Sequence, residues 1–184
     1  RTAAQAHNLI DSVRGSFRLR SNTTDAESAA TVTFDNDGFT VGSQSESNTG
    51  NMVAWCWDAG GTTVSNTDGS ITSSVRASTE YGFSVVTYTG TGAISNSVTI
   101  GHGLGATPAF VITKKRSGGT DYGWSSWHKE LGGNFGVWLD KTNGRNGGMW
   151  AGYTSFSSTV FTPPDLAYGN ESGATYVNYL FSEI

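Results

Sequence analysis

The stretch Gly50-Asn-Met-Val-Ala-Trp-Cys-Trp57 decides the expected fold, because a second stretch of the same kind closes the chain. That second stretch reads Gly173-Ala-Thr-Tyr-Val-Asn-Tyr-Leu-Phe181. In each, a glycine turn precedes residues whose side chains fall alternately on the two faces of a β-strand. We therefore predict core strands at Asn51–Asp58 and Thr175–Ser182, with the large side chains of Val53, Trp55 and Trp57 on one face of the first.

The similarity between these two parts of the chain continues upstream. Gly38-Phe-Thr40 precedes the first stretch much as Val160-Phe-Thr162 precedes the second. Further back, Phe17–Arg20 aligns with Val137–Asp140. Self-similarity of several spaced segments is typical of repeated structural units.

This alignment predicts the domain organisation. Residues 1–60 correspond to the second half of a repeat unit, and residues 61–184 correspond to one complete unit. The strands of the half-unit are expected to pack with the unit that follows. Because the chain starts within a unit and lacks an initiator methionine, we expect it to be part of a longer protein with a preceding half-unit.

Composition predicts an all-β fold. The 184 residues include 25 Gly, 6 Trp, 7 Tyr and 9 Phe but only 3 Pro, which favours short strands joined by tight turns. Turn signals recur between apolar runs, as in Asp35-Asn-Asp-Gly38, where an Asp-Gly step with glycine at positive φ predicts a hairpin. Residues 1–15 form the only segment with helical spacing. We predict an antiparallel β-sandwich of the lectin-like jelly-roll kind.

Charge and cysteine content narrow the possible partners. The net charge is −4 and 14% of residues are charged, which argues against nucleic acid, whose phosphates need clustered cations. No apolar run approaches the length of a membrane helix, so no membrane insertion is expected. A single cysteine, Cys56, excludes an internal disulfide and a thiolate zinc cluster. We expect no metal and no cofactor.

The sequence gives little support to catalysis. His102 lies in the glycine-rich link Gly101–Pro108, which precedes a predicted strand rather than the helix that a phosphate loop needs. No strand carries the closely spaced carboxylates of a sandwich glycosidase. We therefore predict that the chain is not an enzyme and that His102 belongs to a structural turn.

Recognition of a glycan is the remaining chemical possibility. The segment around Asp121, Trp124, Trp127 and His128 combines aromatic rings with polar groups, and such rings stack on sugars while polar groups donate and accept hydrogen bonds. These four residues are the candidate ligand-binding site. The competing interpretation, which we favour, is that both tryptophans cap the core of the sandwich.

Several motifs in order resemble a known repeat. They are Asp11-Ser-Val-Arg-Gly15, Phe34-Asp-Asn-Asp-Gly-Phe-Thr-Val-Gly42, Met52-Val-Ala-Trp-Cys-Trp57, Thr67-Asp-Gly-Ser-Ile-Thr-Ser-Ser-Val75, Gly82-Phe-Ser-Val-Val-Thr-Tyr-Thr-Gly-Thr-Gly92 and Gly101-His-Gly-Leu-Gly105. Together they resemble a tandem-repeat domain of unknown function from structural proteins of marine tailed bacteriophages. There the repeat occurs in tail fibre or tail-associated proteins, often beside concanavalin-like lectin domains.

The resemblance implies a non-enzymatic module on the virion surface, outside the cell, that spaces or presents a host-binding surface. It also implies assembly with copies of itself, as a homotrimer in a fibre, and with other virion proteins. Two alternatives stay open: a lectin-like module that binds host-surface glycans, and a capsid fibre or decoration protein. The resemblance supplies no catalytic or binding residues.

Overall fold

The computed structural model describes residues 6–43, 50–93, 98–118, 123–150 and 155–184. The predicted all-β fold is confirmed, and its centre is an antiparallel sheet of eight strands in the order β13-β12-β11-β10-β15-β8-β7-β6. The bounds of these strands are Val64–Asn66 (β6), Ser73–Ser78 (β7), Phe83–Thr89 (β8), Pro108–Ser117 (β10), Ser125–His128 (β11), Phe135–Trp138 (β12), Asn146–Gly147 (β13) and Thr175–Ser182 (β15).

β15 lies in the middle of this sheet, with β10 and β8 as its two neighbours. Its side chains alternate between two hydrophobic cores, as the pleat requires. Tyr176 and Leu180 join the core on one face of the sheet. Val177 and Tyr179 join the core on the other face. The second of the two matching sequence stretches is therefore the buried core strand that was predicted.

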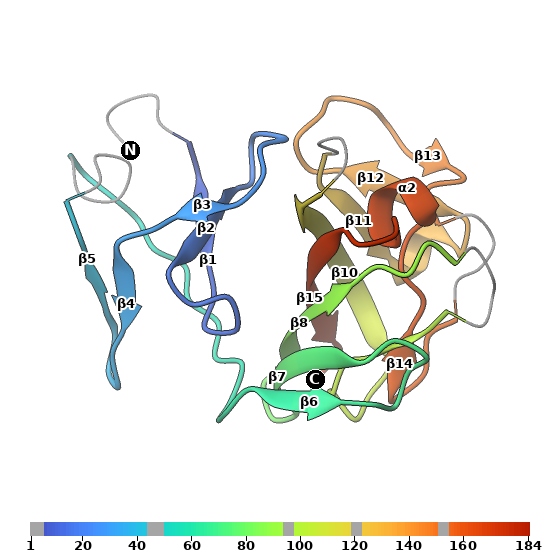
Figure 1. Ribbon diagram of the computed structural model, residues 1–184, viewed down its shortest axis with the longest axis horizontal. Coiled ribbons are helices and arrows are strands. Elements are labelled where there is room, and N and C mark those ends of the chain that lie inside the picture. Colours follow the sequence, from blue (N-terminus) through green and yellow to red (C-terminus); the bar gives the residue numbers. More distant parts are fainter. Residues whose placement is uncertain (1–5, 44–49, 94–97, 119–122, 151–154) are drawn as a thin grey trace.

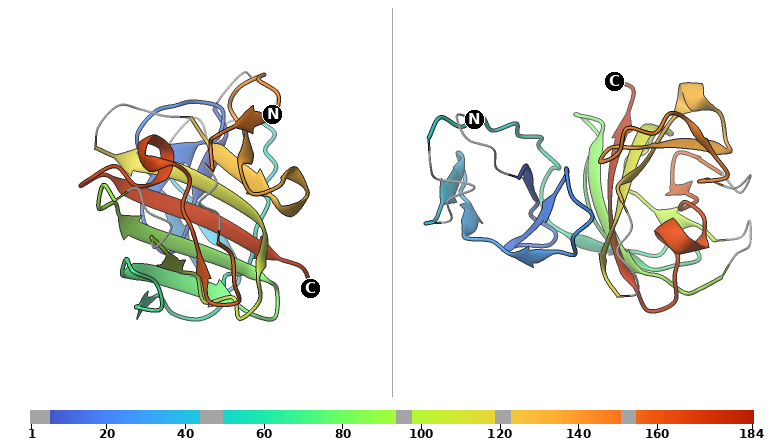
Figure 2. Two further views of the ribbon diagram at one scale, coloured as in Figure 1. Left: turned by 90° about the vertical axis from the view of Figure 1, so that its right-hand side faces the viewer. Right: turned by 90° about the horizontal axis from the view of Figure 1, so that it is seen from above.

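The first face of the large sheet is covered by the connecting residues 98–107, 148–150 and 155–174. These connections contain β9 (Ile100–Gly101) paired with β14 (Val160–Phe161), and the short helix α2 (Leu166–Gly169). Ile100, Trp150 and Phe161 are each 1% exposed or less and fill this core. The sheet and its covering segments form a sandwich, which Figure 2 shows edge-on.

The second face is covered by a separate sheet built from the first part of the chain. This sheet has the order β1-β2-β3, with bounds Asn8–Ile10, Phe17–Arg20 and Ser28–Ala29. Leu19 of β2 is 1% exposed and packs in the same core as Val177 and Tyr179. The small sheet thus packs on the large sheet face to face, without adding a strand to it (Figure 1).

A hairpin of β4 (Val32–Phe34) and β5 (Phe39–Val41) lies beyond the three-stranded sheet (Figure 1). The hairpin at Asp35–Gly38 was predicted, and Phe34 pairs with Phe39 across it. Its turn differs in detail from the prediction, because Gly38 is not among the glycines with positive φ. The turn is instead held by a hydrogen bond from the backbone N–H of Asp35 to the carbonyl of Gly38, 2.9 Å long.

The helix predicted for residues 1–15 is wrong for its described part. Residues 8–10 form β1, in which Leu9 pairs with Leu19 of β2. The loosely helical spacing of apolar residues is a weak preference, and tertiary pairing overrides it. Here β1 pairs with β2 through a tight turn that ends at Gly15 (φ 68°). Residues 1–5 lie outside the described part of the chain.

The strand predicted for Asn51–Asp58 is also absent. The segment has no strand assignment, and Val53 and Trp55 are each 74% exposed. Trp57 is 57% exposed, although its ring lies 6.3 Å from the rings of Phe83 and Phe181. Apolar alternation describes how side chains would be placed in a strand, but a strand needs partners for its backbone, and no strand pairs with this segment in the described structure.

Candidate functional site

Trp124 is the first residue of the predicted glycan site, and the structure places it in the core. Its side chain is 0% exposed and belongs to the core between the two sheets. The indole N–H donates to the carbonyl oxygens of Arg20, at 2.9 Å, and Thr23, at 3.1 Å. Trp124 therefore anchors the loop after β2, and no ring face is open to a ligand.

Trp127 is buried on the opposite face of the same sheet. It is 6% exposed, and its ring centroid lies 4.3 Å from that of Phe156 and 6.4 Å from that of Trp150. Its indole N–H donates to the carbonyl of Gly132. Residues three apart on a strand point to opposite faces, so Trp124 and Trp127 cannot stack on one sugar.

His128 is exposed at the end of β11. Its Nδ1 accepts a hydrogen bond from the backbone N–H of Glu130, and the imidazole thereby caps the short 3-10 helix Lys129–Leu131. Asp121 lies outside the described residues. The structure thus does not bring the described members of the predicted site to one surface, and the burial of both tryptophans supports their role as core residues.

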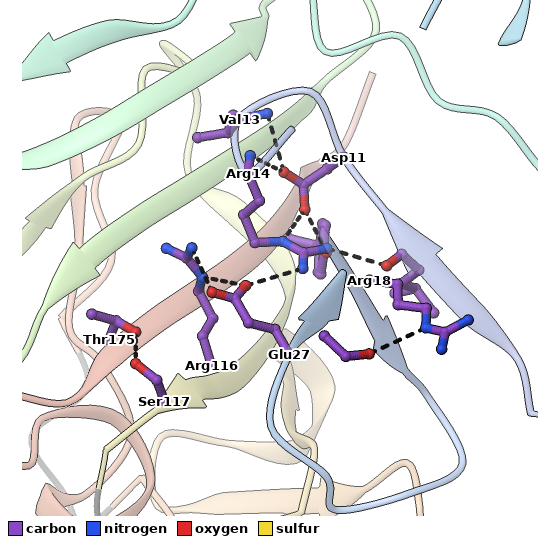
Figure 3. Close-up of polar contacts among 11 residues, drawn as sticks. Asp11, Val13, Arg14, Arg18, Glu27, Arg116, Ser117 and Thr175 are labelled. Carbon is purple, nitrogen blue, oxygen red and sulfur yellow. Dashed lines mark hydrogen bonds and ion pairs between the residues drawn. The ribbon is translucent and has the colours of Figure 1, made fainter. Parts of the chain in front are cut away.

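A polar cluster, which sequence reasoning missed, joins the two sheets. We call it the joint. Its buried members are Asp11, Arg14 and Tyr179, and its half-buried members are Glu27 and Arg116. Figure 3 shows Asp11, Arg14, Glu27 and Arg116. Asp11, Arg14 and Glu27 belong to the β1–β3 lobe, whereas Arg116 and Tyr179 lie on β10 and β15.

The local chain geometry prepares Arg14 for this contact. The carboxylate of Asp11 accepts hydrogen bonds from the backbone N–H groups of Val13, at 3.1 Å, and Arg14, at 2.9 Å, which is the turn geometry that aspartate favours. Gly15 then closes the turn with φ at 68°. The turn points the Arg14 side chain towards the large sheet (Figure 3).

Arg14 makes the central contacts of the joint. Its side chain is 0% exposed, and Nε lies 2.5 Å from Oδ2 of Asp11. Nη2 donates to the hydroxyl of Tyr179, at 3.0 Å, and to the carbonyl of Leu9, at 3.2 Å. The Tyr179 hydroxyl donates in turn to Oδ2 of Asp11, at 2.8 Å. These bonds close a ring between the two sheets.

Glu27 forms the second half of the joint. Its carboxylate accepts two hydrogen bonds from Arg116, each 2.8 Å long, and lies 3.5 Å from Nη1 of Arg14. Its backbone N–H also donates to the carbonyl of Arg116, at 3.0 Å. A bidentate arginine–carboxylate pair fixes both distance and orientation, so Glu27 sets how the two lobes sit against each other.

The charges of the joint balance, with two carboxylates facing two guanidinium groups. Burial lowers the pKa of Arg14, but the neighbouring Tyr179, Asp11 and Glu27 raise it, and the result is a pKa above its ordinary value. Burial and the charge of Asp11 together raise the pKa of Tyr179. Arg14 therefore stays charged and Tyr179 stays protonated, as a donor to Asp11. The cluster thus holds the two lobes together through charged hydrogen bonds.

His102 lies in a buried turn. Its Nδ1 accepts a hydrogen bond from the backbone N–H of Leu104, and its Nε2 lies 3.2 Å from the carbonyl of Ser157. Its side chain is 0% exposed, and burial lowers its pKa. The neutral ring donates on one side and accepts on the other, so both nitrogens are used within the fold.

A shallow hollow lies beside β12, β13 and α2. Its lining residues are Trp138, Lys141, Asn143, Gly144, Arg145, Asn146 and Tyr168. The ammonium of Lys141 lies 3.9 Å from the centroid of the Trp138 ring. The hollow thus presents aromatic edges, two cationic side chains and amide groups together, on residues that sequence reasoning did not select.

Among the described residues, no group of three or more His, Cys, Asp and Glu side chains is placed to hold a metal ion. Within the same residues, no helix has the length and apolar character needed to cross a membrane.

The fold and the joint define an antiparallel all-β sandwich that is locked to a second, smaller β lobe. The chain belongs to the family described as "Domain of unknown function (DUF7483)", whose match covers residues 1–184. Neither curated proteins nor solved structures gave a significant match.

Proposed function

We propose that this chain is a non-enzymatic structural module of a bacteriophage tail fibre or a related virion appendage, which spaces or presents a host-binding surface. The observation that carries the proposal is the joint. It connects two lobes of one chain through the buried ring of Asp11, Arg14 and Tyr179 and through the half-buried Glu27–Arg116 pair. The bidentate Glu27–Arg116 pair restricts the orientation of the lobes, which suits a spacer that must keep its neighbours aligned.

The resemblance of the chain's motifs to repeats of tail proteins supports the same class. Such a module would sit on the virion surface, next to copies of itself, in a homotrimer, and next to other virion proteins. The sandwich is a reasonable building block for this position, because a sheet with both faces covered exposes little backbone to proteases.

Labelling of intact particles tests the proposal. Antibodies raised against the purified chain should mark the tail or its fibres in electron micrographs of virions, and peptides of the chain should be present in purified particles. Label on the capsid would favour the alternative, a capsid fibre or decoration protein. Absence of the chain from purified particles would contradict both.

A second candidate is a carbohydrate-binding, lectin-like module for host-surface glycans, and the hollow beside β12 and α2 favours it. Lys141 and Arg145 supply positive charge, Asn143 supplies an amide, and Tyr168 supplies an aromatic edge. Sugar sites combine such groups, and two cations would favour an acidic glycan. In this candidate the site is the hollow, and the buried Trp124 and Trp127 take no part.

A glycan array that includes acidic polysaccharides tests this candidate. We expect binding to an acidic sugar to fall about tenfold in Arg145→Ala, which removes a charged hydrogen-bond donor worth about 1.4 kcal/mol or more. Asp25→Asn, a charge change in the other lobe, is the matched control and should bind normally. Retained binding in Arg145→Ala would place any glycan site elsewhere.

A further inference from the structure

The segment Asn51–Trp57 places apolar side chains in solvent on both of its faces. Met52 is 40% exposed, Val53 and Trp55 are 74% exposed, and Trp57 is 57% exposed. Cys56, the single cysteine of the chain, is exposed as well. A run of large apolar side chains that is open on both faces marks a segment that is covered by something else when it functions.

The pairing of the strands shows what this segment corresponds to. In the small sheet, Phe17 pairs with Ala29, and in the large sheet Phe135 pairs with Gly147. Both members of the second pair lie 118 positions after those of the first, from 17 to 135 and from 29 to 147. The structure thus aligns Phe17 with Phe135, two residues from the alignment with Val137 that sequence reasoning predicted.

The preceding strands correspond in the same way. Leu9 of β1 pairs with Leu19, and Ser126 of β11 pairs with Val137. The offset is 117 from Leu9 to Ser126 and 118 from Leu19 to Val137. The connection between β11 and β12 is therefore one residue longer than the connection between β1 and β2. The sheet β1-β2-β3 therefore has the order and register of β11-β12-β13.

Within this correspondence, the exposed segment takes the place of β15. Gly50 has φ at 70° and Gly173 has φ at 76°, so both stretches begin with the same left-handed turn. In the large sheet, β10 lies between β11 and β15, and β8 lies on the far side of β15. The small lobe has a counterpart of β11 in β1, which is its edge strand, but no counterpart of β10 or β8 among the described residues.

We propose that Asn51–Trp57 is a β-strand that a second copy of the β6–β10 segment completes. The copy is a segment of the kind seen here at residues 62–115, supplied on the N-terminal side by another copy of this module. Its β10 would pair with β1 and with Asn51–Trp57, and its β8 would pair with the other edge of Asn51–Trp57. The chemistry fits, because β8 and β10 meet β15 with apolar side chains such as Val86 and Val111, each 0% exposed.

This completion makes the module a link in a chain. In each unit, a β6–β10 segment would pair with the strands that follow it in the chain, which correspond to β1–β3 and Asn51–Trp57. The outer face of these strands would then pack on the next unit through the joint. The inference stands apart from the proposed virion role, since it rests on registers and exposure alone.

The test uses an extended chain, in which a second copy of residues 62–115 is added directly before Arg1. The added Lys115 then precedes Arg1 as the natural Lys115 precedes Arg116. The added copy contains no tryptophan and no cysteine. Cys56 therefore remains the only thiol, and the exposed fluorophores remain Trp55 and Trp57, since the other four tryptophans are 8% exposed or less.

We expect Cys56 to react with Ellman's reagent at least about tenfold more slowly in the extended chain than in the 184-residue chain, because a thiol inside a sheet reacts only after local opening. Acrylamide should quench the tryptophan fluorescence less, and light scattering should show a monomer. The matched control carries Val111→Pro and Thr113→Pro in the added copy only, which removes backbone donors from its β10 and should restore fast labelling.

Three results would overturn the proposal. Cys56 could label equally fast in both chains, or the extended chain could fail to stay folded and monomeric. Alternatively, Cys56 could already be protected in the 184-residue chain by self-association, in which case a second whole chain fills the site instead.

Discussion

Arg14 shows how a single residue connects the two lobes. It holds Asp11 within its own turn and reaches Tyr179 on the large sheet. Because Arg14 is fully buried, removing its charge would leave the Asp11 carboxylate without its counter-ion in a site that water does not reach. A buried charge that loses its partner is far more costly than the net gain from an intact pair.

We therefore expect Arg14→Met to lower the free energy of unfolding by about 3–5 kcal/mol, as measured by urea denaturation. Asp25→Asn is the matched control. Its carboxylate is 59% exposed and lies 3.6 Å from Arg20, so its loss should cost about 1 kcal/mol or less. Equal losses in the two variants would mean that the joint contributes nothing special.

His102 gives the fold a dependence on pH. Burial holds its pKa below the ordinary value, with partial compensation by the Ser157 hydrogen bond and by Asp68. As the pH falls below about 6.5, the unfolded chain takes up a proton at this position and the native protein does not, so stability is lost in acid. Above that pH the contribution is fully present.

Between pH 7 and pH 5 the melting temperature should therefore fall less in the variant His102→Asn than in the unchanged protein. The difference should be up to about 3 °C, the shift that ~1 kcal/mol produces in a chain of this size. The amide oxygen of the variant can still accept from the N–H of Leu104. His128→Asn is the control, because His128 accepts the equivalent bond from Glu130 but is exposed. If the melting temperature of His102→Asn fell as much in acid as that of the unchanged protein, His102 would not be the source of the pH dependence.

Among the elements, β2 determines how the small sheet packs. Leu19 is 1% exposed and reaches the core of the large sheet, whereas Phe17, two residues earlier, is 43% exposed. The two side chains lie on the same face of the strand, yet only one of them is buried deeply.

Leu19→Ala should consequently lower the free energy of unfolding by about 2–5 kcal/mol, through lost burial and the cavity left behind. Phe17→Ala should change it by about 1 kcal/mol or less, although it removes a larger side chain. Thermal denaturation of the two variants measures both effects. If Phe17→Ala proved the more damaging, the face that packs on the large sheet would have to be assigned differently.

The elements also show what sequence could and could not predict. The all-β class and the Asp35–Gly38 hairpin followed from turn residues and alternation, which are local signals. Asn51–Asp58 was predicted as a core strand because alternation says nothing about whether partner strands exist. The joint was invisible for a similar reason, since Asp11 and Tyr179 are 168 residues apart in sequence. Trp124 and Trp127, three apart, are separated by the sheet itself.

At the scale of the whole molecule, the described chain contains one sandwich and a lobe that follows half of the same plan. The two lobes are held by the joint and by the core around Leu19. Asn51–Trp57 passes along the small lobe towards β6 and belongs to no sheet (Figure 1). If each unit is completed by the one before it, a series of units would place one joint at every boundary and keep a fixed orientation along the series.

The most direct test of this plan is amide hydrogen exchange of the two matching stretches, residues 51–57 and 175–181. In the 184-residue chain, residues 51–57 should exchange at least about a hundredfold faster than residues 175–181, as an unpaired segment does beside a core strand. In the chain extended by residues 62–115, the two stretches should become similarly slow. Slow exchange of both stretches before extension, or fast exchange of residues 51–57 after it, would contradict the completion of the small lobe by a second β6–β10 segment.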